Sequence, residues 1–338
     1  MPVGAIVVLG GPALVERTAV SAGPAATKTE PLDCLAGTPI AALEILGQSA
    51  LQRTIRYLQQ VGVKPISLTA AAGLPDLAGA SISSAVNVLV HQTGKVWPVL
   101  GRVVDEYIKG GVKTILLIRL GAYVEFDFAD LVQFHRDKAQ PMTQVTDGDG
   151  PLDFWMLDAL HFSTIGMHLL EKTCAAGRGS IAYYDQATYV NRLSTASDVR
   201  HLVVDAFSSR HAVRPSGTEI GPGVWLDDNA RVHPRARVAG PVYIGRDTRV
   251  QATALLARFS SVERSCNIGC GTVVADASIL AHTHLGAWLD VSHAVIYGSK
   301  VAHLRHNVTV DIQDDRLIRR RTSAFHRFLP SFPDIREP

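Results

Sequence analysis

The chain has 338 residues, a formal net charge of +2 at pH 7 and 19% charged residues. This length is enough for two domains, each with a core of ordinary size. So small a net charge gives no strong positive field over the protein, and we therefore expect no nucleic-acid partner.

The chain opens on an apolar run from Ala5 to Gly10, with no basic segment before it. The run is too short to span a bilayer and is typical of a first buried strand. We therefore expect a cytoplasmic protein that does not interact with a membrane.

Strand-like and helix-like patterns alternate over the first two hundred residues. The patterns predict strands at 5–9, 66–70, 86–90 and 113–118, and helices near 48–61, 97–109 and 129–138. This alternation predicts an α/β domain over residues 1–210 with a doubly wound, Rossmann-like sheet. Ligands of such sheets bind at the carboxyl ends of the strands, where Gly10, Gly11 and Gly121 fall. These glycines are our nucleotide-binding candidates, and tight turns that need glycine for their own conformation are the alternative explanation.

From residue 218 to 313 the sequence repeats every six residues. One position of each repeat is aliphatic, in the series Ile220, Leu226, Val232, Val238, Ile244, Val250, Leu256, Val262, Ile268, Val274 and Leu280. Four positions after each of the first ten comes a small or β-branched residue, until His284 breaks the series, and Leu285 and Val291 then take the inward role. Two inward positions in every six residues are the signature of a parallel β-helix, whose coils bury their apolar faces only by stacking.

The remaining residues, 314–338, carry the one basic cluster of the chain. It consists of Arg316, Arg319, Arg320, Arg321 and Arg327. We interpret this segment as a solvated tail.

An α/β domain followed by hexapeptide repeats resembles the sugar-1-phosphate nucleotidyltransferases, especially the mannose-1-phosphate guanylyltransferase branch. Residues 39–63 are similar to the family's Pro-Lys…Gly-x-Pro-Leu-Leu helix and the Gly-Val turn after it. Residues 128–143 are similar to the helix and strand that follow the family's metal-binding turn. The resemblance implies that the repeats form a left-handed β-helix of three strands per coil. It also implies attack of a sugar phosphate on the α-phosphorus of a nucleoside triphosphate, with Mg²⁺ assisting.

The positions that match the family's catalytic residues hold other residue types. Ala13-Leu14-Val15 stands where the family has Gly-Thr-Arg, Ile40 replaces a lysine, Ala122 replaces the first metal-binding aspartate, and Asn191 is the best match to the second. A neutral amide is a much weaker Mg²⁺ ligand than a carboxylate. We therefore assign no catalytic residue and no metal site.

These departures predict a catalytically impaired homologue that acts as a ligand-binding, regulatory or scaffolding subunit in sugar-nucleotide or polysaccharide metabolism. Its expected ligand is a nucleotide or sugar nucleotide, and no cofactor is expected. The first alternative is an active pyrophosphorylase with relocated groups, in which Arg17 or Lys28 supplies the cation and Glu125 or Asp127 the carboxylate. Only this alternative requires Mg²⁺.

A second alternative is acyl transfer on the β-helix, because hexapeptide-repeat acyltransferases use a histidine as general base. The candidate residues are His282, His284 and His293. A polar cap on the last coil explains the same histidines without a reaction.

We also expect the repeats to drive self-association into a homo-oligomer. Their flat strand faces carry apolar and aromatic side chains, such as Trp225, Tyr243 and Trp288, that are stabilised by burial between subunits.

Overall fold

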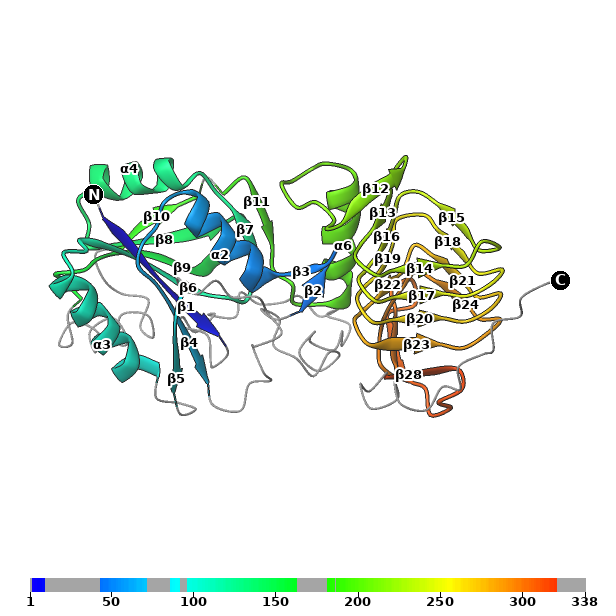
Figure 1. The fold of residues 1–338 in the computed structure, drawn as a ribbon. Helices are drawn as coiled ribbons and strands as arrows, with labels where there is room; N and C mark the ends of the chain where they lie inside the picture. The colour runs from blue at the N-terminus through cyan, green and yellow to red at the C-terminus, as the bar shows by residue number, and fades with distance from the viewer. Residues whose placement is uncertain are drawn as a thin grey trace. The chain divides into compact units, whose positions relative to one another are not determined.

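The computed structural model describes residues 2–9, 43–71, 86–91, 96–162, 181–185 and 187–320. The chain has a mixed α/β fold with many parallel strands (Figure 1). It divides into two compact units, Met1–Val213 and Arg214–Pro338.

Unit 1 contains a seven-stranded sheet in the order β10-β8-β9-β6-β1-β4-β5. Its strands are β1 (Val3–Leu9), β4 (Ile66–Ala71), β5 (Val86–His91), β6 (Thr114–Arg119), β8 (Met142–Asp147), β9 (Gly150–Asp158) and β10 (Ile181–Tyr184). Strands β5, β4, β1 and β6 are parallel, as are β8 and β10. Strand β9 is antiparallel to both of its neighbours, β6 and β8.

Helices cover both faces of this sheet. Residues Val7 and Leu9 of β1 belong to a core that includes apolar residues of α2 (Ala50–Gln60) and α4 (Phe128–Lys138). Residues Ile6 and Val8 face a second core, built with α3 (Val96–Lys109). Because successive strand residues point to opposite faces, a strand covered on both sides is apolar throughout, as β1 is.

The helices start where the sequence supplies caps. Ser49 and Gln52 form a capping box at α2, and Asp127 caps α4. A second capping box, between Thr195 and Asp198, begins α6 (Ala196–Phe207). Each cap satisfies backbone N–H groups that have no partner inside the helix.

The predicted strands at 5–9, 66–70, 86–90 and 113–118 are confirmed as β1, β4, β5 and β6, and the three predicted helices as α2, α3 and α4. The sequence analysis did not predict the β8–β9 hairpin. Its turn, Asp147–Gly150, has the Asp-Gly composition of a hairpin turn, and Gly150 adopts φ = 122°. This hairpin makes the sheet mixed.

Unit 2 is a stack of coils in which successive strands enter three parallel sheets in turn. The first sheet contains β13 (Val224–Leu226), β16 (Val242–Ile244), β19 (Ser260–Val262), β22 (Ser278–Ile279) and β25 (Ala294–Tyr297); the second contains β14 (Arg231–Val232), β17 (Arg249–Val250), β20 (Asn267–Ile268) and β23 (Thr283–Leu285); the third contains β15 (Arg237–Ala239), β18 (Leu255–Ala257), β21 (Val273–Ala275) and β24 (Asp290–Ser292). Each is named below by its first strand: the β13, β14 and β15 sheets. The pairing of Arg231 with Arg249 and of Arg237 with Leu255 shows that one coil uses three hexads.

The predicted inward residues from Ile244 to Val274 are confirmed, because all six belong to one buried core. The prediction that Ile220, the first member of the series, points inward is wrong. Ile220 lies in β12 (Thr218–Gly221), which pairs antiparallel with β13, and is 62% exposed.

The change of register also comes earlier than predicted. Val262 pairs with Ile279, one residue short of three hexads, so Ala277 and Ile279 join the apolar core of the coils. Ser278 and Leu280 are also buried, but they lie outside this core cluster. The Ser261 hydroxyl donates to Ser278 Oγ, 2.9 Å away. Leu285 and Val291 then occupy inward positions, as predicted.

Antiparallel strands close the C-terminal end of the stack. β26 (Lys300–His303) and β27 (Val308–Asp311) extend the β13 sheet, and β28 (Ile318–Arg320) pairs with β23. The predicted tail 314–338 therefore begins with an ordered strand, because Ile318 is apolar and joins the core. Residues 321–338 lie outside the described residues.

Within the described residues, no helix combines the length and the apolar character needed to cross a bilayer.

Candidate functional site

The carboxyl ends of β1, β4, β5 and β6 lie at one edge of the unit 1 sheet, because these strands are parallel. Strand β6 ends at Arg119, and Gly121 and Ala122 follow before β7 (Tyr123–Glu125). Three residues singled out in the sequence, Gly10, Gly11 and Ile40, lie outside the described residues, as do Arg17 and Lys28.

An ion pair that the sequence analysis missed lies at this edge. Arg119 Nη1 is 3.0 Å from Asp153 Oδ2 of the neighbouring strand β9, and the two side chains are 22% and 14% exposed. Arg119 also aligns with Val8 near the end of β1. The sequence offered one sign of this ion pair, an arginine at the end of an apolar strand. It did not indicate the partner, because Asp153 lies 34 residues away along the chain.

Gly121 lies two residues after this arginine, and its backbone conformation does not require a glycine. Its φ lies outside the left-handed region, and among the described residues a Cβ atom built on it would meet only Arg119 Nη1, at the ordinary contact distance of 3.5 Å. A turn that demands glycine therefore does not explain this residue.

The two positions matched to metal-binding aspartates are brought close together, but Asn191 has a structural role. Strands β7 and β11 (Tyr189–Asn191) pair antiparallel, and Asn191 lies opposite Tyr123, the residue after Ala122. The Asn191 side chain is buried; its Nδ2 donates to the Asp198 carbonyl at 2.8 Å, and its Oδ1 accepts from the Leu193 N–H at 3.0 Å. Both ends of the amide thus hold the chain that leads into α6.

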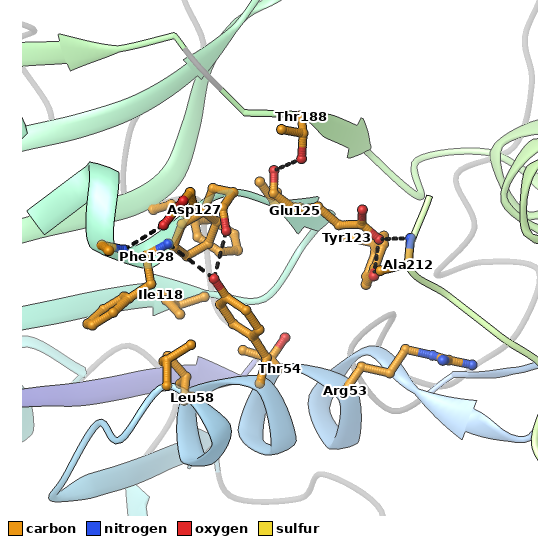
Figure 2. Close-up of a pocket in the computed structure, with 16 residues that line it drawn as sticks. Arg53, Thr54, Leu58, Ile118, Tyr123, Glu125, Asp127, Phe128, Thr188 and Ala212 are labelled. Carbon is orange, nitrogen blue, oxygen red and sulfur yellow. Dashed lines mark hydrogen bonds between the residues drawn. The ribbon is translucent and has the colours of Figure 1, made fainter. Parts of the chain in front are cut away.

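Beside this segment lies a pocket of about 560 Å³ between α2 and the β7–α4 connection (Figure 2). Its volume lies within the usual range of small-molecule sites. Apolar side chains dominate its lining, together with the polar groups Arg53, Thr54, Tyr57, Tyr123, Glu125, Asp127 and Thr188.

Tyr57 crosses from α2 to the opposite wall of the pocket. Its hydroxyl donates to the Phe126 carbonyl at 2.6 Å and accepts from the Phe128 N–H at 3.2 Å. Burial raises the pKa of Tyr57, with a further contribution from the Asp127 and Glu125 charges. The phenol therefore remains protonated at neutral pH and ties α2 to the start of α4.

The carboxylates of the pocket are Glu125 and Asp127. Glu125 Oε1 accepts from the Tyr123 hydroxyl at 2.6 Å and from the Ala212 N–H at 2.7 Å. Asp127 Oδ1 instead accepts from the N–H groups of Ala129 and Asp130 in the first turn of α4. In Figure 2 the two side chains point in opposite directions. They are therefore not arranged as a pair of ligands for one cation.

In the part of the chain that the structure describes, no three His, Cys, Asp or Glu side chains gather as they would around a metal ion. The side chain of Tyr123 is partly buried, and this burial is the largest cause that raises the pKa of its phenol. The hydrogen bond to Glu125 raises this pKa further. The Tyr123 phenol is therefore a hydrogen-bond donor here.

The three candidate histidines of unit 2 lie in different parts of the coil. His282 occupies the corner between β22 and β23 with φ = 62°, and its N–H donates to the Arg264 carbonyl at 3.0 Å. His284 lies within β23, with its Nδ1 2.9 Å from Asn267 Nδ2. His293 lies at the corner between β24 and β25, where its Nδ1 contacts Asp276 Oδ2. A strand of the β13 sheet separates the corners of His282 and His293, so these residues do not form one cluster.

Comparison with known proteins adds no assignment: no protein-family model matches the chain, and no curated protein matches it.

Proposed function

We propose that the chain is a catalytically impaired homologue of the sugar-1-phosphate nucleotidyltransferases. In this proposal unit 1 is a Rossmann-like, doubly wound domain that binds a nucleotide or sugar nucleotide without converting it, and unit 2 is a left-handed β-helix. The protein then acts as a regulatory or scaffolding subunit in sugar-nucleotide or polysaccharide metabolism.

The observation that carries this proposal is the chemistry at the carboxyl edge of the unit 1 sheet. A guanidinium, Arg119, lies there beside Gly121, whose turn does not need a glycine. A guanidinium in contact with a glycine turn suits an anionic ligand, since such sheets bind ligands at this edge.

The residues needed for turnover do not accompany this binding chemistry. Phosphoryl transfer depends on positioned cations and metal ligands, and the loss of one such contact costs about 3 kcal/mol in the transition state. Ala122 has no carboxylate, and the Asn191 amide is engaged with the backbone. The divergence of Glu125 and Asp127 gives no support to relocated metal ligands. The chain is therefore better suited to holding a sugar nucleotide than to making one.

Calorimetry and thermal shift against nucleoside triphosphates, sugar phosphates and sugar nucleotides test this proposal on the full chain. We expect saturable binding of at least one nucleotide or sugar nucleotide, with stabilisation of about 2.7 kcal/mol at a hundredfold excess over Kd. Arg119→Met weakens that binding, and the matched control Arg102→Met, at an exposed position of α3, does not.

Turnover is measured separately as pyrophosphate release with Mg²⁺ present. We expect none above background. Ordinary turnover with any substrate pair overturns the impaired-enzyme proposal, and a screen without any nucleotide or sugar-nucleotide ligand overturns the binding proposal.

A further inference from the structure

The β15 sheet presents a flat outer face along one side of the coil stack (Figure 1). The inward residues of its strands are Val238, Leu256, Val274 and Val291, so the residues before and after each of these point outward. The pairing register aligns the outward residues in two columns. One column is Arg237, Leu255, Val273 and Asp290, and the other is Ala239, Ala257, Ala275 and Ser292.

The centre of this face is apolar and its two ends carry opposite charges. Leu255, Val273 and the alanines beside them are partly exposed. Arg237 is exposed on the first strand and Asp290 on the last. Neither of these two charged side chains forms an ion pair with a described residue, and both are exposed.

We propose that this face binds the same face of a second copy of the chain, in a two-fold symmetric dimer whose axis runs parallel to the strands. This inference names an interface for the expected homo-oligomer and does not depend on the proposed ligand. Rotation about such an axis reverses the order of the strands and preserves their direction. Strand β15 then faces β24 of the second copy, and β18 faces β21.

In this arrangement Arg237 lies opposite Asp290 of the second copy, at both ends of the interface. The centre pairs Leu255 with Val273 and Ala257 with Ala275. Small side chains at the centre let the two sheets approach to the usual face-to-face spacing of about 10 Å. Apolar burial supplies the driving force, and the paired charges fix the orientation.

The other two-fold axis that lies in the face runs along the stack, and it gives a worse match. Each strand would then meet its own copy in the reverse direction, so Arg237 would face Ala239 and Asp290 would face Ser292. Both charges would be partly buried without a partner of opposite charge, which is costly. The charges therefore select the axis parallel to the strands.

A second pair of charges, at the corners that follow β18 and β21, obeys the same symmetry. These corners hold Arg258 and Asp276, with φ = 55° and 50°. Because β18 faces β21 of the second copy, Arg258 lies opposite Asp276. The Asp276 carboxylate also contacts His293 and keeps part of its surface exposed.

The corners that precede β15 and β24 add a third match. Trp288 is 77% exposed, and its ring lies against Gly271, where a Cβ atom would come within 2.4 Å of it. The residue at the equivalent place before β15 is Arg235, which is also exposed. The proposed axis brings Arg235 to Trp288 of the second copy, where a guanidinium is attracted to the aromatic face.

Sedimentation velocity on the full chain tests the dimer through a charge exchange. Arg237→Asp or Asp290→Arg alone places like charges opposite each other at both ends, so we expect each single variant to weaken association at least about tenfold. The double variant restores opposite charges and is expected to recover the dimer. Arg231→Asp, on the exposed edge of the β14 sheet, is the matched control and is expected to associate like the unmodified chain.

Circular dichroism checks that each variant folds. If a charge reversal prevents folding, Arg237→Gln and Asp290→Asn provide the same comparison with smaller changes, and each is expected to weaken the dimer. A monomeric unmodified chain, single variants that associate normally, or a double variant that remains monomeric overturns the proposal.

Discussion

Arg119 and Asp153 form an ion pair across β6 and β9 at the carboxyl edge of the unit 1 sheet, with Nη1 and Oδ2 3.0 Å apart. Both side chains are mostly buried, so neither charge is fully solvated by water. Strand β9 therefore holds in place the cation that we assign to ligand binding.

Asp153→Asn is expected to lower the free energy of unfolding by about 1–3 kcal/mol, because it removes the negative charge that Arg119 Nη1 contacts at 3.0 Å in a mostly buried place. Urea denaturation measures this loss. Asp149→Asn is the control, since Asp149 is exposed in the nearby hairpin turn. Equal stability of the two variants would show that Asp153 does not hold Arg119.

Asn191→Asp is expected to destabilise unit 1 without creating a Mg²⁺ site. The substitution removes the N–H donor to the Asp198 carbonyl and places a carboxylate in a buried position, at a cost of about 1–3 kcal/mol. The double variant Ala122→Asp with Asn191→Asp is therefore expected to show no Mg²⁺ binding by calorimetry. Measurable Mg²⁺ binding by the double variant would instead support an alignment in which both positions face one site.

Ile268→Ala is expected to lower stability by about 2–5 kcal/mol, because Ile268 is fully buried in the coil core. The outward residue Arg249, on the adjacent strand β17 of the same sheet, supplies the control. Arg249→Ala is expected to change stability by less than about 0.5 kcal/mol. Denaturant midpoints of the two variants compare an inward with an outward position, and similar losses would contradict the assigned register.

The hexad pattern predicted the inward positions because every hexad places residues at the same two positions inside the coil, and both must suit the core. It did not locate the register change, since Ile279 and Leu280 are both apolar and only the pairing with Val262 distinguishes them. The run of apolar residues before Arg119 predicted strand β6. The partner of Arg119 could not be predicted in the same way, because it depends on the β8–β9 hairpin, which brings Asp153 beside that strand. The structural role of Asn191 was equally hidden, because its hydrogen bonds go to backbone groups that no side-chain pattern marks.

Alkaline pH is expected to destabilise unit 1 through Tyr107. Its side chain is buried against Gly4, and its hydroxyl is 2.9 Å from the Ala5 carbonyl and 2.8 Å from Ser67 Oγ. Burial raises the pKa of Tyr107 to about 12. The same phenol in the unfolded chain has a pKa of about 10.

The sign of the effect follows from this difference in pKa. Below pH 10 the phenol is protonated in both states, so its contribution to stability is fully present. Between about pH 10 and pH 12 the unfolded chain loses the proton first, and stability falls by an amount on the order of 2 kcal/mol. Tyr107→Phe removes this group and is expected to reduce the loss over that range, while Tyr189, whose pKa burial also raises to about 12, still contributes to it. Tyr183→Phe, at an exposed position, is expected to leave the loss unchanged. Urea unfolding at a series of pH values measures both slopes, and identical slopes for Tyr107→Phe and the unmodified chain would show that Tyr107 does not titrate with unfolding.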